Sequence, residues 1–145
     1  MSKVSQIFEL MQPFVEDGKL LNRSYEDLNQ VINDFVVLEE GGQIIACAGL
    51  KFYKPENAGE IYALAVKKSF HNSGTSSKLM EALIQKSINM ELSYIFALSK
   101  FGGRFFLRYG FTEAELISLP LIRQKSYDNQ RKSVIYLRVL NKNCL

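Results

Sequence analysis

Apolar residues recur at helical spacing twice near the start of the chain. In residues 4–15 they stand three and four positions apart, which predicts an amphipathic helix. Residues 25–34 repeat this spacing directly after Ser24, whose hydroxyl suits the position that caps a helix N-terminus. The chain is therefore expected to begin with two helices.

The pattern then changes to that of strands. Residues 35–40 and 43–53 are two largely apolar runs separated by Gly41-Gly42, which predicts a β-hairpin with a tight turn. Residues 60–66 form a third run, apolar enough for a strand that is buried on both faces.

The second half alternates between helix and strand patterns. The predicted elements are a helix that ends near residue 90, a strand at 92–99, a short aromatic helix at 102–110, an irregular stretch at 113–130 and a last strand at 132–140. The strand at 92–99 comes one helix after the strand at 60–66, so the two can lie side by side and parallel. This order predicts an α/β fold with a central mixed β-sheet flanked by helices.

Length and composition fit one soluble domain over residues 1–145. A content of 47% hydrophobic and 12% aromatic residues argues against disorder. No apolar run approaches the roughly 20 residues of a membrane span, and the N-terminus lacks the features of a signal peptide. Cys47 and Cys144 lie in a strand-like run and in the tail, which favours a reducing compartment over a disulfide scaffold. These features predict a cytoplasmic protein without a membrane partner.

The net charge does not point to nucleic acid. It is only +3, and no strand interleaves aromatic with basic residues as nucleic-acid-binding surfaces do. Basic residues gather late in the chain, between positions 123 and 132. This group fits either a small anionic ligand or an ordinary solvated surface.

The joint between the third strand and the next helix is rich in small polar residues. Residues 73–77 read Ser-Gly-Thr-Ser-Ser, with Gly74 able to adopt a positive φ. A helix N-terminus carries unpaired N–H groups and a partial positive charge, so such a joint can hold a phosphate. Serine and threonine are also ordinary helix caps, and the motif is not a P-loop, because no Gly-Lys-Ser/Thr follows.

The order of strand, phosphate-type loop, helix, strand and aromatic helix ending in Gly110-Phe111 resembles the acetyl-CoA core of the GNAT N-acetyltransferases. The resemblance implies the GNAT fold, in which two parallel strands splay apart. It also implies acetyl-CoA as cosubstrate, with pantetheine between those strands and pyrophosphate on the loop amides. No metal is expected.

Further motifs narrow the resemblance to the acetyltransferase domain of N-acetylglutamate synthases. These are Leu-x-Arg-Ser at 21–24, the hairpin at 39–50, Gly59-Glu60, Ser-Leu-Pro at 118–120 and Tyr-x-x-Gln-Arg-x-Ser at 127–133. The resemblance covers residues 4–140. It implies transfer of an acetyl group to glutamate or a related acidic amino acid, and a place in arginine biosynthesis. The amino-acid-kinase domain of many synthases, with any arginine site it holds, is not in this sequence.

The resemblance assigns acetyl-CoA to the end of the core strand and to the following loop. The implied residues are Leu64, Ala65, Val66, His71, Asn72, Ser73, Gly74, Thr75, Ser76 and Ser77. His71 stands where the family has Arg or Gln, and Ser76 where it has Gly or Ala. His71, the only histidine, can also be a simple exposed loop residue.

The acceptor end is expected to be cationic. Arg23, Arg123 and Arg131 match basic positions of the family, and guanidinium groups bind carboxylates in two-point fashion. For Arg23 the alternative is a surface residue at a helix start. For Lys125 and Lys132 the alternative is an ordinary solvated lysine on the surface.

The chemistry requires a base and a proton for the leaving thiolate. Glu60 is the candidate base, acting through water, although it can also be a charged residue that closes a turn after Gly59. Ser133, or the thiol itself with water, is the candidate acid. Many GNAT enzymes carry a Tyr where Phe106 stands here, and Tyr109 is the nearest alternative.

Two other departures leave a second function open. Ala63 replaces the usual Cys or Lys of the core strand, and residues 99–101 differ from the family segment after the next strand. The alternative to an enzyme is a catalytically weak acyl-CoA-binding module that acts as a partner or regulatory subunit. In either case the resemblance implies a possible homodimer through the C-terminal strands.

Overall fold

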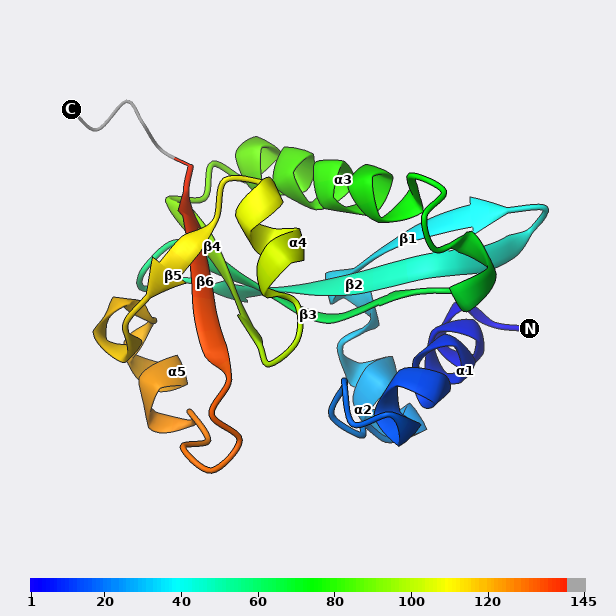
Figure 1. Cartoon of the computed structure of the whole chain (residues 1–145), viewed down its shortest axis with the longest axis horizontal. Helices are drawn as coiled ribbons and strands as arrows, with labels where there is room; N and C mark the ends of the chain where they lie inside the picture. The colour runs from blue at the N-terminus through cyan, green and yellow to red at the C-terminus, as the bar shows by residue number, and fades with distance from the viewer. Residues whose placement is uncertain (141–145) are drawn as a thin grey trace. The chain divides into compact units, whose positions relative to one another are not determined.

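The described residues, 1–140, form a six-stranded mixed sheet with helices beside it, as the computed structural model in Figure 1 shows. The strand order is β1-β2-β3-β4-β6-β5. The strands are β1 Phe35–Glu40, β2 Gln43–Tyr53, β3 Ala58–Val66, β4 Tyr94–Ser99, β5 Thr112–Ala114 and β6 Val134–Val139. The helices are α1 Lys3–Glu16, α2 Tyr25–Gln30, α3 Thr75–Asn89, α4 Gly103–Arg108 and α5 Leu121–Lys125. Three short 3₁₀ turns cover Ile32–Asp34, Lys68–Phe70 and Leu116–Ser118.

The chain divides into two compact units. The first holds Met1–Leu50 and Tyr62–Gln85, and the second holds Lys51–Ile61 and the chain from Lys86 onward. The expectation of one domain stays a prediction. Cys144 lies outside the described residues.

In the first unit, the apolar stripes expected for the two N-terminal helices form its core. The stripe of α1 is buried together with Leu28 of α2 and with side chains of the strands. Ser24 Oγ accepts a hydrogen bond from the Asp27 amide at 3.0 Å, which confirms the predicted cap of α2. β1 and β2 pair antiparallel, and Gly41 and Gly42 both have positive φ, as a tight hairpin turn requires.

In the second unit, β3 and β4 are parallel neighbours, as predicted. Their register runs from Ala58 opposite Tyr94 to Ile61 opposite Ala97. β4 and β5 both pair antiparallel with β6. One cluster in the core of this unit consists of five buried residues that are distant in sequence: Tyr53, Ala58, Phe96, Leu119 and Ile135.

The prediction of an irregular stretch at 113–130 was wrong in part. This stretch contains the end of β5, a 3₁₀ turn and the helix α5. The Leu121 amide at the start of α5 donates to Glu56 Oε2 at 3.2 Å. A distant side chain therefore caps this helix, and the local pattern carries no sign of it. No helix in residues 1–140 has the length and apolarity to cross a membrane.

Candidate active site

The loop before α3 is exposed and leads directly into the helix N-terminus, as expected, where Thr75 is buried. Asn72 and Gly74 have φ values of 61° and 85°, and Gly74 is exposed. The Lys78 amide donates to the Gly74 carbonyl at 3.1 Å, which starts the 15-residue helix. The hydroxyls of Ser73 and Thr75 lie 2.8 Å apart. The helix therefore presents its first N–H groups and its partial positive charge at this loop.

His71 ties the same loop to the end of β3. Its Nε2 lies 2.8 Å from the Val66 carbonyl oxygen, and its ring lies 6.2 Å from that of Phe14. The side chain of this exposed residue therefore links the loop to the end of the strand. The predicted contact of His71 with acetyl-CoA stays a prediction.

The core strand β3 is continuous but contains one residue with a left-handed backbone. Ala63 has a φ of 52°, a left-handed conformation that is uncommon for a residue with a side chain. Its carbonyl accepts a hydrogen bond from Cys47 Sγ at 3.6 Å. Burial raises the pKa of the Cys47 thiol to about 12, so the thiol remains protonated and can donate. An irregularity of this kind redirects the backbone that follows, which here is Leu64, Ala65 and Val66.

Glu60, the predicted base, is bonded to two other side chains of the second unit. Only 7% of the residue is exposed. Its Oε1 accepts a hydrogen bond from the Tyr53 hydroxyl at 2.8 Å and forms an ion pair with Arg123 Nε at 2.9 Å. The Nη1 group of Arg123 also donates to Ser126 Oγ at 3.0 Å. Two predicted site residues, Glu60 and Arg123, are thus direct partners.

Tyr53 is the member of this cluster that sequence reasoning missed. Burial, and next the negative charge of Glu60, raise the pKa of its hydroxyl well above the usual value. The hydroxyl therefore remains a donor at physiological pH. The sequence carries no local signal for this role, because the hydroxyl gains significance only once Glu60 is seen to accept from it.

Arg23 lies on an aromatic ring in the first unit. Its guanidinium carbon is 5.1 Å from the centre of the Tyr62 ring, a cation–π contact. The Tyr62 hydroxyl donates to Asp34 Oδ2 at 2.6 Å, and the ring lies edge-on to Phe35. The half-buried Arg23 is therefore held against the residue that precedes Ala63.

Arg131 and Ser133 lie together in the segment before β6. The Arg131 amide donates to Asp128 Oδ1 at 3.3 Å. Ser133 is 7% exposed, and its carbonyl accepts a hydrogen bond from the Tyr127 hydroxyl at 2.6 Å. The predicted residues thus fall into two sets. Arg23 and the acetyl-CoA segments belong to the first unit, and Glu60 belongs with Arg123, Arg131 and Ser133 to the second.

Phe106 of α4 and Tyr109, which follows the end of α4, differ in exposure. Phe106 is buried and stacks on Tyr136 with ring centres 5.6 Å apart. Tyr109 is half-buried beside Phe105, and its carbonyl accepts a hydrogen bond from Arg138 Nη1. The replacement of the family's tyrosine by Phe106 therefore leaves a hydrocarbon ring at that position.

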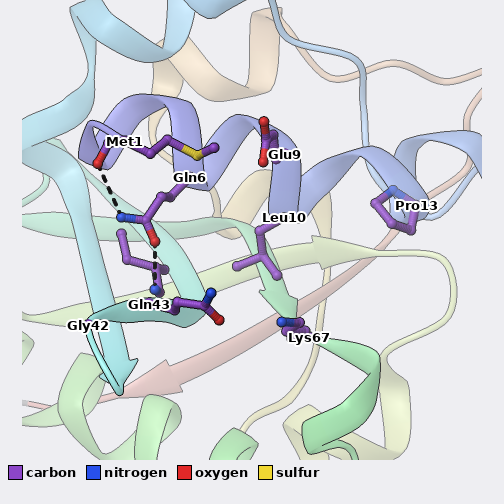
Figure 2. Close-up of a pocket in the computed structure, with 9 residues that line it drawn as sticks. Met1, Gln6, Glu9, Leu10, Pro13, Gly42, Gln43 and Lys67 are labelled. Atoms are coloured by element: carbon purple, nitrogen blue, oxygen red, sulfur yellow. Dashed lines mark hydrogen bonds between the residues drawn. The ribbon is translucent and has the colours of Figure 1, made fainter.

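A cavity of about 530 Å³ lies elsewhere in the first unit (Figure 2). α1 and the hairpin turn line it, and the side chain of Gln6 links the Met1 carbonyl to the Ile44 amide. None of the predicted site residues lines this cavity, although Lys67 at its edge directly follows Val66. Within residues 1–140, no group of three His, Cys, Asp or Glu side chains could hold a metal ion.

Known proteins match nearly the whole chain. Residues 3–111 match the model of the acetyltransferase (GNAT) family. An amino-acid acetyltransferase of Neisseria meningitidis serogroup A is 36% identical over 140 residues, which are 96% of this chain and 32% of that protein. The corresponding protein of Pasteurella multocida is 32% identical over 139 residues, again 96% of this chain and 32% of that protein.

A solved structure shares the fold. N-acetylglutamate synthase from Neisseria gonorrhoeae, in complex with coenzyme A and N-acetyl-glutamate, superposes with a TM-score of 0.91 at 36% identity. The match covers 98% of this chain and 34% of that chain. The chain thus spans about a third of the length of the relatives it matches. The predicted resemblance and the predicted fold class are both confirmed, and the chain belongs to the GNAT family of acetyltransferases.

Proposed function

We propose that this protein is an amino-acid N-acetyltransferase that moves the acetyl group of acetyl-CoA to the α-amino group of glutamate or a related acidic amino acid. The observation that carries the proposal is the likeness, over 98% of this chain, to the synthase that was crystallised with coenzyme A and N-acetyl-glutamate. As a small-molecule enzyme of this kind, it is proposed to work in the cytoplasm, and the homodimer stays a prediction.

Acetyl-CoA is proposed to bind along the end of β3 and on the following loop. The backbone of residues 64–66, which follows the irregularity at Ala63, would contact the acetyl and pantetheine groups. Residues 71–77 would hold the pyrophosphate with backbone N–H groups at the start of α3. The left-handed Gly74 and the exposed position of the loop support this assignment, because a phosphate can approach such a turn closely.

The acceptor is proposed to bind through cations. Arg23 and Arg131 would each hold a carboxylate of an acidic amino acid, and a charge-assisted hydrogen bond contributes about 1.5–3 kcal/mol. The stacking of Arg23 on Tyr62 supports its part, since it orients the guanidinium. Arg123, the third predicted cation, already donates to Glu60 and Ser126.

The reaction needs little from the side chains. The acceptor ammonium loses a proton through water to Glu60, and the amine nitrogen attacks the thioester carbonyl. The new C–N bond forms as the C–S bond breaks, and the coenzyme A thiolate takes a proton from Ser133 or from water. Binding both reactants in line supplies much of the rate, and backbone N–H groups of β3 polarise the carbonyl.

The second candidate is an acyl-CoA-binding module with weak catalysis. It is favoured by the buried hydrocarbon ring of Phe106, which stands where many GNAT enzymes place a tyrosine. The test measures thiol release from acetyl-CoA with twenty amino acids and several polyamines, with Glu60→Gln as control. Release with glutamate that falls in the control supports the synthase activity. Thiol release with another amine would keep the enzyme activity but change the proposed acceptor. No thiol release with any acceptor, while calorimetry still detects acetyl-CoA binding, favours the acyl-CoA-binding module.

A further inference from the structure

The carboxylate of Glu60 is held on one of its two oxygens. Both side-chain contacts that the structure gives Glu60, from the Tyr53 hydroxyl and from Arg123 Nε, fall on Oε1. A carboxylate has lone pairs on each oxygen, so this arrangement keeps those of Oε2 for an incoming proton. The proposed function requires a carboxylate base, but it does not itself require that the two oxygens have different partners.

Both donors are themselves fixed, and they come from different elements. Tyr53 is the last residue of β2, and the centre of its ring lies 5.8 Å from the centre of the Phe96 ring. The Lys51 ammonium lies 5.2 Å from the centre of the Tyr53 ring. Arg123 is on α5, where Ser126 accepts from its Nη1 group. The raised pKa of Tyr53 supports the same picture, since a protonated phenol donates and cannot repel the carboxylate.

The ion pair between Glu60 and Arg123 is shielded from water. The side chains of Arg123 and Glu60 are 20% and 9% exposed, respectively. A buried charge left without its partner is costly, so the cluster resists rotation of the carboxylate. An exposed pair would hold the group far less well.

We propose that Tyr53 and Arg123 are positioning residues that clamp Oε1 of Glu60, so that Oε2 is the oxygen that accepts the proton of the acceptor. The clamp rests on the proposed role of Glu60 as base. Arg123 then acts through Glu60, whereas Arg23 and Arg131 act on the acceptor. A carboxylate that is displaced by about 1 Å loses on the order of a hundredfold in rate.

The kinetic test compares Tyr53→Phe and Arg123→Gln with Tyr94→Phe, which removes a hydroxyl beside the same core cluster. At saturating acetyl-CoA, each of the first two is expected to lower kcat by about 10- to 100-fold. The acceptor KM and the Kd of acetyl-CoA should stay within about twofold, and Arg123→Lys, which keeps the charge, should recover part of kcat. Tyr94→Phe should leave all these values unchanged. A raised KM with unchanged kcat in Arg123→Gln would instead place Arg123 on the acceptor and overturn the clamp.

A structural test separates the clamp from the proposed function. Crystal structures of Tyr53→Phe and Arg123→Gln, which each remove one of the two donors to Oε1, are expected to show the Glu60 carboxylate rotated from its wild-type position. An unmoved carboxylate in both variants overturns the clamp even if the enzyme is active. Silence of the wild-type protein in the acceptor panel overturns the proposed function, while the crystal structures still decide the clamp.

Discussion

Gly49 lies under the ring of Tyr62, and a single methyl group there should be enough to disturb the first unit. An ideal Cβ at this position would lie 2.5 Å from Cε1 and 2.9 Å from Cε2 of Tyr62. These separations are far below the usual 3.5–4.0 Å between carbon atoms, so either the ring or the strand must move. The ring cannot move freely, because the hydroxyl is bonded to Asp34 and the ring edge meets Phe35.

The two ways of relieving the clash set the size of the effect. A shift of β2 that keeps the ring in place is an overpacked core, which costs about 1–3 kcal/mol. Rotation of the ring would forfeit the hydrogen bond to Asp34, worth about 1.5–3 kcal/mol, and the aromatic pair, worth about 0.5–1.5 kcal/mol. The protein takes the less costly course, and replacing glycine within a strand returns about 0.5–1 kcal/mol. Gly49→Ala should therefore destabilise the protein by about 1–2 kcal/mol.

A double-mutant cycle with Tyr62→Ala measures this directly. Urea unfolding is followed by circular dichroism, because the chain contains no tryptophan. Without the ring, Gly49→Ala should cost less than about 0.5 kcal/mol, which gives a coupling of at least about 0.5 kcal/mol. The same cost in both backgrounds, or no cost with Tyr62 present, would refute the argument. In the proposed enzyme Gly49→Ala should also raise the acceptor KM, since Arg23 rests on the ring.

Three further predictions concern the loop, the acceptor end and the core. Gly74→Val forces a β-branched residue into a φ of 85°, so calorimetry should detect no acetyl-CoA binding; unchanged affinity contradicts the pyrophosphate assignment. Arg131→Ala should raise the KM for an acidic acceptor by about 10- to 100-fold without changing acetyl-CoA affinity, and an unchanged KM removes Arg131 from the site. In a Cys144→Ser background, the thiol of Cys47, with a pKa of about 12, should react with a thiol reagent at pH 8 only after unfolding; fast modification of the folded protein contradicts its burial.

Local patterns were sufficient for most of the fold. The stripes that predicted α1 and α2 are the faces now buried in the first unit, and the cap at Ser24 forms as expected. The parallel neighbours β3 and β4 followed from the helix between them, because a parallel connection needs such a crossover. These features depend on residues that are close in sequence.

The helix α5 could not be predicted in the same way. It has only five residues, and its apolar side chains Leu121 and Ile122 are each 68% exposed, so no buried stripe marks it. Its first amide is bonded to Glu56, which is 65 positions earlier in the chain. An isolated helix of this length is unstable in water, and its formation here depends on contacts that the sequence does not display.

In the candidate site, too, single residues could be predicted from the sequence, whereas the contacts between them could not. Glu60 and Arg123 were singled out separately by their likeness to family motifs, one as base and the other as substrate cation. Their bond spans 63 positions, and no spacing rule connects them. Tyr53 was missed because a tyrosine at the end of an apolar strand looks like any other core residue. Its hydroxyl becomes informative only when a carboxylate is seen to accept from it.

The conformation of Ala63 joins the fold to the proposed chemistry. A left-handed alanine inside a strand costs about 1–2 kcal/mol, so it persists only where its surroundings hold it. Here the residue is 5% exposed in the core of the first unit, and its carbonyl accepts a hydrogen bond from the fully buried Cys47. The residues proposed to contact acetyl-CoA begin at the next position, where a regular strand would continue without redirection. Packing around Ala63 therefore maintains this irregularity, and the proposed contacts of Leu64, Ala65 and Val66 with acetyl-CoA give it a physical reason.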